Sequence, residues 1–130
     1  MTNQELIAKA KEAMTKAYAP YSHFQVGAAL LAKDGRVFTG CNVENATYGA
    51  TICAERTAVT KAVSEGVREF EKIAIVASSG DYAAPCGICR PVLFEFMPEG
   101  KVVLWSELEG EKEFALTELL PFGFRGEDIK

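Results

Sequence analysis

The chain lacks an excess of positive charge. Its 14 lysines and arginines stand against 18 aspartates and glutamates, which gives a formal net charge of −4. The basic residues are scattered, and no stripe of lysine and arginine interleaved with aromatic residues occurs. Because binding to a phosphate backbone requires such a basic footprint, a nucleic acid polymer is not expected as a partner. A small neutral substrate fits this composition better.

Long hydrophobic runs and targeting segments are also missing. There is no run of ~18 apolar residues, so no membrane-spanning segment and no membrane partner are expected. The N-terminal stretch MTNQELIAKAKEAM is amphipathic and lacks the apolar core of a secretory signal. The sequence shows no internal repeat and no low-complexity linker. We therefore expect a single domain over residues 1–130, located in the cytoplasm, where cysteines stay reduced.

Hydrophobic periodicity and turn signals divide the chain into helices and strands. Helices are predicted at residues 3–18, 52–66, 86–97 and 115–120. Strands are predicted at residues 26–33, 36–43, 72–77 and 101–105. Thr2 or Asn3 is the expected N-cap of the first helix, and Asp34-Gly35 indicates a hairpin between the first two strands. Strands that alternate with helices predict an α/β layered sheet, which the hairpin makes mixed rather than purely parallel.

Three cysteines and one glutamate carry the strongest chemical signal. Cys53-Ala54-Glu55 lies at the start of one predicted helix, and Pro85-Cys86-Gly87-Ile88-Cys89 lies at the start of the next. A structural zinc site is usually closed by four protein ligands, whereas a hydrolytic site keeps one position open for water. Three thiolates and a spare carboxylate therefore predict a catalytic zinc centre. A structural zinc knot, a redox pair and unrelated cysteines are the alternatives, but a redox CxxC pair leaves Cys53-Ala54-Glu55 unexplained.

The residues around these motifs suggest how the thiolates are stabilised. Cys53 and Cys86 with Cys89 are expected in the first turns of two helices, where free N–H groups and partial positive charge favour thiolates. Arg56 and Arg90 each follow a motif directly and are candidate donors to the sulfurs, which would restore the attraction of the metal for its water. Cys41 is expected to be a buried thiol and His23 a surface residue, and neither is expected to bind metal.

These motifs resemble those of the cytidine/deoxycytidylate deaminase family, in particular its small homotetrameric zinc-dependent members. The resemblance runs nearly end to end and includes the blocks Phe24–Ala29, Gly40–Asn45 and Cys53–Ala58. It implies a three-layer α/β/α sandwich with a mixed five-stranded sheet and one Zn²⁺ per subunit. It also implies hydrolytic deamination of cytidine and 2′-deoxycytidine in pyrimidine salvage, in which zinc-bound hydroxide attacks C4 and Glu55 shuttles the proton.

The resemblance further implies a substrate pocket shared between the subunits of a homotetramer. Asn42 and Glu44 alternate along a strand end, so both side chains can point to one side and hold a ribose hydroxyl. Phe24 and Val26 resemble the residues that wall the base, and the N–H of Ala54 resembles the donor to its 2-oxo group. The residues that resemble those lent to a neighbouring subunit are Ala46, Tyr48 and Phe124.

The sequence departs from the family pattern at several positions. Pro91 stands where relatives usually have glutamine, so the helix is expected to begin close to Cys89. Ala50-Thr51-Ile52 and Phe122-Gly123 also differ from the usual residues. A deaminase of another cytosine nucleoside, such as a nucleoside antibiotic, remains an alternative, as do an RNA- or DNA-editing deaminase and a catalytically impaired zinc-binding homologue. The run from Asn42 to Asn45, the acidic charge and the intact Glu55, respectively, argue against them.

Overall fold

A mixed five-stranded sheet forms the central layer of the protein, which the computed structural model describes over residues 1–129. The strands lie in the order β2-β1-β3-β4-β5. Their bounds are Val26–Ala32 for β1, Val37–Cys41 for β2, Phe70–Ala77 for β3, Lys101–Ser106 for β4 and Gly110–Ala115 for β5. β3 and β4 run parallel, and the other neighbouring pairs are antiparallel. The sheet is mixed, as the sequence predicted.

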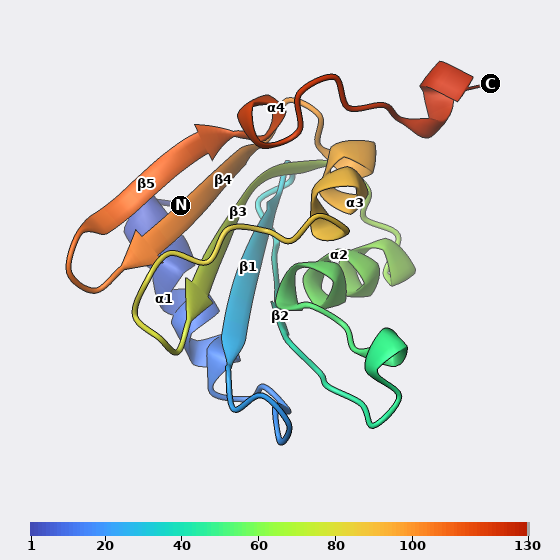
Figure 1. Cartoon of the computed structure of the whole chain (residues 1–130). Helices are drawn as coiled ribbons and strands as arrows, with labels where there is room; N and C mark the ends of the chain where they lie inside the picture. Colours follow the sequence, from blue (N-terminus) through green and yellow to red (C-terminus); the bar gives the residue numbers. More distant parts are fainter. Residues whose placement is uncertain (130) are drawn as a thin grey trace.

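Helices cover both faces of this sheet (Figure 1). α1 (Asn3–Met14) lies on one face, whereas α2 (Ala54–Ser64) and α3 (Cys89–Phe96) lie on the other. The short α4 (Leu116–Leu119) follows β5, and 3₁₀ turns occupy Tyr48–Ala50 (η1) and Gly126–Ile129 (η2). The expected three-layer α/β/α sandwich is confirmed. Within residues 1–129, no helix has the length and apolar character needed to cross a membrane.

β1 and β3, two of the three interior strands, are buried on both faces because their side chains alternate between two hydrophobic clusters. In β1, Leu30 joins the cluster beneath α2 and α3, and Leu31 joins the cluster beneath α1. In β3, Ile75 belongs to the first cluster and Val76 to the second. This two-sided burial explains the continuous apolar runs in the sequence. It also fixes the register of β1 and β3, because a slip of one residue would exchange the two clusters.

Local signals in the sequence account for the first helix and the first hairpin. The Thr2 side chain accepts a hydrogen bond from the Glu5 N–H, and the Glu5 carboxylate accepts one from the Thr2 N–H, which is a capping box. In the β1–β2 turn, Asp34 accepts from the Arg36 N–H at 3.0 Å, and Gly35 takes φ = +96°. The predicted N-cap at Thr2 and the predicted hairpin are both confirmed.

The structure differs from the prediction in several element boundaries and in one strand that was not predicted. α1 ends at Met14 instead of residue 18, because the Tyr18 N–H and carbonyl bond to Asn42 and Glu44 and pull the chain into an extended bridge. β5 was not predicted from the residue pattern. Its residues are mostly exposed and charged, so they carry no apolar alternation, and pairing with β4 defines the strand.

Candidate active site

The structure brings three thiols together at the N-terminal ends of α2 and α3. Cys53 is the N-cap of α2, and Cys89 is the first residue of α3. The Cys86 sulfur lies 3.6 Å from that of Cys53 and 3.3 Å from that of Cys89, and all three Sγ atoms lie within 4.8 Å of one another. Cys86 precedes α3 instead of lying in its first turn, because the helix begins at Cys89, as Pro91 led us to expect.

The chemistry of this thiol cluster (Cys53, Cys86 and Cys89) fits a zinc ion. The pKa of Cys53 is lowered to about 5, chiefly because the Cys89 thiol donates to its thiolate and secondly because Arg56 does. The pKa of Cys89 is raised, first because the Cys89 thiol donates its proton to the Cys53 sulfur and secondly because the Cys89 side chain is buried. One thiolate is therefore already favoured at neutral pH, and thiolate sulfur is a preferred zinc ligand. Three ligands leave one tetrahedral position for a water molecule or substrate.

Glu55 lies beside the cluster without belonging to it. It is the second residue of α2, it is only 4% exposed, and its carboxylate is not one of the atoms grouped around the three sulfurs. Burial is the largest cause that raises its pKa, to about 7, and the neighbouring Cys53 thiolate raises it further. A carboxylate with a pKa near neutrality can both accept and release a proton, as general acid–base catalysis requires.

A pocket of about 280 Å³ opens in front of Glu55 and two of the thiols. Five of the predicted substrate residues line it: Phe24, Val26, Asn42, Glu44 and Ala54. The lining also includes six residues that sequence reasoning did not select: Ser22, Thr51, Ile52, Ile75, Ala83 and Ala84. The pocket is lined largely by apolar groups, and its two ionisable carboxylates, Glu44 and Glu55, come from different segments. No lysine or arginine lines the pocket within the described chain.

Asn42 and Glu44 both face the pocket, but each also holds the backbone of a neighbouring segment. The Asn42 side chain accepts from the Val26 N–H and donates to the Phe24 carbonyl, both at 2.8 Å. The Glu44 carboxylate accepts from the N–H groups of Tyr21 and Ser22 at 2.9 and 3.1 Å and from the Ser22 hydroxyl. The Ser22 hydroxyl is the largest cause that lowers the pKa of Glu44. The two side chains therefore shape the wall that contains Phe24 and Val26.

Ser22 and Thr51 are the two polar pocket residues that sequence reasoning missed, and Ser22 is the one that bonds to selected residues. Its hydroxyl donates to Glu44 and accepts from the Phe24 N–H at 3.1 Å, so it links two residues that were selected. The only sequence signal was its place in the Ala19-Pro20-Tyr21-Ser22 turn, where a serine hydroxyl commonly bonds to nearby backbone.

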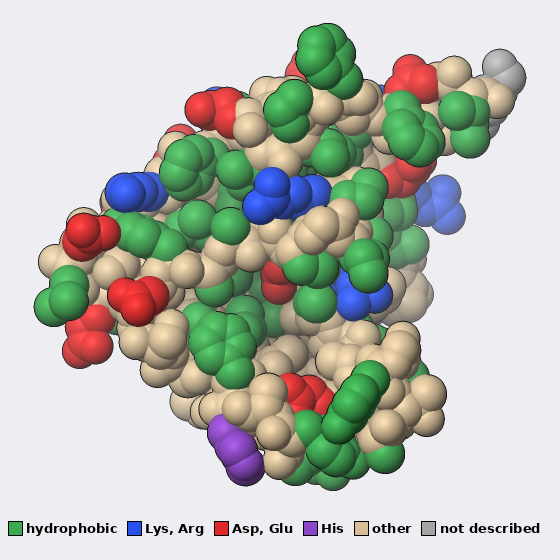
Figure 2. All heavy atoms as spheres, in the orientation of Figure 1, with side chains coloured by type: hydrophobic (Ala, Val, Ile, Leu, Met, Phe, Trp, Pro, Cys, Tyr) green, Lys and Arg blue, Asp and Glu red, His purple; other side chains and the backbone are tan. Residues whose placement is uncertain are grey.

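Ala46, Tyr48 and Phe124 do not line the pocket of their own chain. Tyr48 begins η1, is 75% exposed and packs edge-on against Tyr21 with ring centroids 6.0 Å apart. Phe124 belongs to the C-terminal segment, which extends away from the body of the protein beyond α4 (Figure 1). Figure 2 shows hydrophobic side chains on the surface of this segment. Tyr48 instead lines a neighbouring hollow of about 390 Å³ together with Tyr21, Ser22, Glu44 and Thr51, three of which also line the pocket.

The two arginines differ in what they contact. Arg56 donates from Nη2 to the Cys53 sulfur at 3.5 Å and to the Thr51 carbonyl at 3.4 Å, while its buried Nε has no partner in the described residues. Arg90 instead donates to the carbonyls of Pro85 at 2.7 Å and Leu119 at 2.9 Å. It thus fixes the backbone just before Cys86, and no bond from Arg90 to a sulfur occurs within residues 1–129.

His23 and Cys41, which were not expected to bind metal, lie outside the site. His23 is exposed and has φ = +60°, and Cys41 is half-buried at the end of β2. Neither belongs to the thiol cluster. The surface position predicted for His23 is confirmed, whereas Cys41 is less buried than predicted because β2 is the edge strand of the sheet.

Comparison with known proteins gives one consistent family. Residues 1–105 match the family described as cytidine and deoxycytidylate deaminase zinc-binding region. The chain is 51% identical to a cytidine deaminase of Halalkalibacterium halodurans, over 99% of this chain and 98% of that one. It is 48% identical to a cytidine deaminase of Sporosarcina psychrophila, over 99% and 96% of the two chains.

A solved structure agrees with these sequence matches. The crystal structure of cytidine deaminase from Burkholderia pseudomallei superposes with a TM-score of 0.90 at 49% identity, covering 95% of this chain and 100% of that one. A match to the family over residues 1–105, together with similarity along the whole length of these relatives, leads to one conclusion: the chain belongs to the cytidine and deoxycytidylate deaminase family.

Proposed function

We propose that the protein hydrolyses cytidine and 2′-deoxycytidine to uridine and 2′-deoxyuridine with release of ammonia. The observation that carries this proposal is the buried Glu55 carboxylate, which lies in one pocket with the thiol cluster and has its pKa raised to about 7. Cys53, Cys86 and Cys89 would hold one zinc ion per subunit. When bound there, zinc supplies Lewis-acid activation of a water molecule at the open coordination position.

Glu55 carries out the proton transfers in this proposal. Its carboxylate accepts a proton from the attacking water and delivers it to ring N3. It then takes the proton of the new C4 hydroxyl and donates it to the departing 4-amino group, which leaves the 4-oxo product. Water adds at C4, the C4–N bond breaks, and the atoms balance as nucleoside plus water giving deaminated nucleoside plus ammonia. Burial limits the contact of Glu55 with bulk water, and its raised pKa suits both directions of transfer.

The walls of the pocket supply binding and orientation. Phe24 and Val26 offer apolar contact to the base, and the Ala54 N–H at the start of α2 is a donor suited to its 2-oxo group. Asn42 and Glu44 are the groups suited to a ribose hydroxyl.

The charges at the pocket favour a nucleoside over a nucleotide. A 5′-phosphate would find no lysine or arginine in the lining given by residues 1–129, and the Glu44 carboxylate is already on the ribose side of the pocket, so the phosphate would be left without a cation. We therefore expect cytidine and 2′-deoxycytidine to be substrates and 2′-deoxycytidine 5′-monophosphate to be turned over poorly.

We further propose that the protein acts as a homotetramer in which Ala46, Tyr48 and Phe124 complete the pockets of neighbouring subunits. The support is their absence from their own pocket together with large exposed side chains, with Tyr48 75% and Phe124 65% exposed. Size-exclusion chromatography with light scattering tests the assembly, for which we expect four times the 14.1 kDa of one chain. Three reduced cysteine ligands suit a cytoplasmic enzyme of pyrimidine salvage.

The direct test is the loss of the cytidine absorbance band during incubation with the purified protein. We expect turnover by the zinc-loaded protein, loss of turnover on chelation, and recovery on addition of zinc. Glu55→Ala should retain zinc and lose about 10²–10⁴-fold in kcat. No turnover of either nucleoside by a protein that contains stoichiometric zinc would overturn the proposal and point to a different cytosine derivative or an impaired site.

A further inference from the structure

One wall of the pocket belongs to a connection with few backbone contacts. The β3–α3 connection (residues 78–88) contributes Ala83, Ala84 and Cys86 to the pocket. Near its start, the Gly80 carbonyl accepts from the Glu107 N–H at 2.8 Å, and near its end the Pro85 carbonyl accepts from Arg90. Between these points, no backbone hydrogen bond of residues 82–84 occurs in the described chain. The middle of the wall must therefore be held by side chains.

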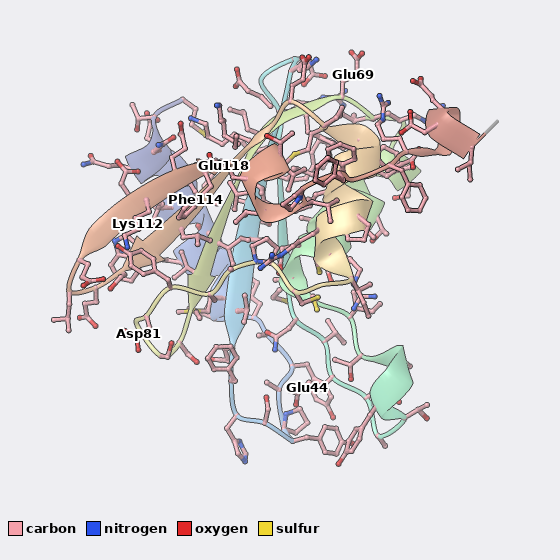
Figure 3. All side chains as sticks on the ribbon, turned by 45° about the horizontal axis from the view of Figure 1, so that its top comes forward. Glu44, Glu69, Asp81, Lys112, Phe114 and Glu118 are labelled. Atoms are coloured by element: carbon pink, nitrogen blue, oxygen red, sulfur yellow. The ribbon has the colours of Figure 1, made fainter. Side chains whose placement is uncertain are left out.

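Tyr82 is the residue of this stretch that reaches another element. Its hydroxyl donates to the Gly110 carbonyl at 3.0 Å, and the Lys112 ammonium lies 4.7 Å from the centre of its ring. The ring is half-buried against the core cluster beneath α2 and α3. Gly110 and Lys112 belong to β5, whose hairpin with β4 runs beside the connection (Figures 1 and 3). Tyr82 thus joins the connection to this hairpin by a hydrogen bond, a cation–π contact and apolar packing.

The hairpin is a firm support for such a contact. β4 and β5 pair continuously from Lys101 with Ala115 to Ser106 with Gly110, so the acceptor carbonyl sits at the end of a paired ladder. The two residues that follow Tyr82 are alanines: Ala83 packs against the same core cluster, and neither methyl group can form a hydrogen bond to another element. Pro85 restricts the backbone next to them. A fixed Tyr82 and a fixed Pro85 together leave Ala83 and Ala84 little freedom to move.

We propose that Tyr82 is a positioning residue, which holds the Ala83–Ala84 wall and the approach to Cys86 in place by bonding to the β4–β5 hairpin. Tyr82 does not line the pocket, so it acts on substrate only through the wall. It acts on the metal through Cys86, four residues further along the chain. The effect on substrate rests on the function proposed above, whereas the effect on the wall and on metal retention does not.

Two substitutions separate the contributions of the side chain, and a third serves as the control. Tyr82→Phe removes the hydrogen bond and keeps the ring, whereas Tyr82→Ala removes every contact. Lys11→Met is the matched control, because it removes a cation–π contact with Trp105 (3.6 Å) at the neighbouring strand but on the opposite face of the sheet. All three are made in the full-length zinc-loaded protein.

Three measurements read out the proposal. In Tyr82→Ala, hydrogen–deuterium exchange should accelerate in peptides that cover residues 78–88 while α1 keeps its protection. Zinc should pass to a competing chelator about 10-fold faster, because Cys86 is less firmly held. At saturating zinc, KM for cytidine should rise about 2- to 10-fold with kcat changed less than about twofold, since Glu55 lies in α2 and Cys53 is its N-cap. Tyr82→Phe should fall between wild type and Tyr82→Ala in each measurement.

The outcomes decide the proposal without depending on turnover. Wild-type exchange in residues 78–88 together with wild-type zinc release in Tyr82→Ala would overturn it. Accelerated exchange spread equally over α1 and the connection would also overturn it, because Tyr82 would then support global stability alone. The proposal would also be overturned if Lys11→Met changed exchange in residues 78–88 and zinc release as much as Tyr82→Ala does. If the wild-type protein failed to deaminate cytidine, the proposed function would fall, while exchange and zinc release would still test the role of Tyr82.

Discussion

Gly40 offers a sharp test of how the sheet sets the position of the catalytic helix. A Cβ atom at Gly40, on β2, would lie 2.4 Å from the Ala54 carbonyl oxygen and 2.6 Å from the Ala58 nitrogen. Both atoms belong to the backbone of α2, so no side-chain rotation can relieve the overlap. α2 packs on β2 at this close approach, and Cys53 and Glu55 lie at its N-terminal end, as the N-cap and the second helical residue.

The Gly40→Ala substitution should therefore cost both stability and activity. Ordinary van der Waals contact begins near 3.4 Å, so α2 must move by about 1 Å to accept the methyl group. Overpacking of this kind costs about 1–3 kcal/mol. For a domain of this size, that corresponds to a fall in Tm of roughly 3–12 °C. A 1 Å displacement of the group that moves the proton can lower kcat about 10²-fold.

Gly27→Ala provides the control on the other face. Its Cβ would lie 2.0 Å from the Ala10 oxygen and 2.5 Å from the Met14 nitrogen, both in the backbone of α1. We expect a loss of Tm at least as large as for Gly40→Ala, with kcat close to wild type at temperatures where the variant is folded. Thermal denaturation by circular dichroism and cytidine turnover measure the two effects. A wild-type Tm and kcat for Gly40→Ala, or an equal loss of kcat in folded Gly27→Ala, would refute the reasoning.

Three further outcomes are expected. Thr2→Ala removes the acceptor for the Glu5 N–H and should lower stability by about 1 kcal/mol, seen in urea denaturation, with an unchanged KM because α1 lies on the face away from the pocket. Chelation should abolish turnover and make the thiols of Cys53 and Cys86 reactive toward a disulfide reagent, while the buried Cys89 stays protected and far-ultraviolet circular dichroism is retained; a protein that unfolds on chelation would contradict this. Glu44→Gln should lower stability near neutral pH. Because Ser22 lowers the pKa of Glu44 below its ordinary value of 4.5, that stability is present in full above this value and is lost as the pH falls through the lowered pKa. The gap in stability between wild type and variant should therefore close in acid, and a gap that persists unchanged would contradict the assignment.

The elements that could be predicted from the sequence are those with local causes. The capping box at Thr2, the Asp34-Gly35 turn and the apolar runs of β1 and β3 depend on neighbouring residues, and all of them occur in the structure. β5 has no such cause. Glu111 and Glu113 are exposed, and the strand exists because its backbone pairs with β4 across a short hairpin. An edge strand of this kind needs charge on its surface to avoid pairing with other chains, which removes the hydrophobic alternation that would have revealed it.

The same distinction applies to the site. The spacing of Cys86 and Cys89 and the pairing of Cys53 with Glu55 predicted which residues would gather, and the three sulfurs do lie together. The remaining walls arise from segments that meet only in the folded chain. Ala83 and Ala84 carry no chemical signal in the sequence, because a methyl group that lines a pocket is indistinguishable from one that fills a core.

Asn42 and Glu44 show how a residue can be structural and functional at once. The carboxylate of Glu44 offers about four lone-pair sites, and three hydrogen bonds from Tyr21 and Ser22 occupy three of them. The Asn42 amide uses one of its two N–H groups on the Phe24 carbonyl. Each side chain therefore keeps free capacity at the pocket while its internal bonds fix its orientation. A group already held in place loses little side-chain entropy when it bonds a ribose hydroxyl, so the contacts that shape the wall also favour the proposed binding.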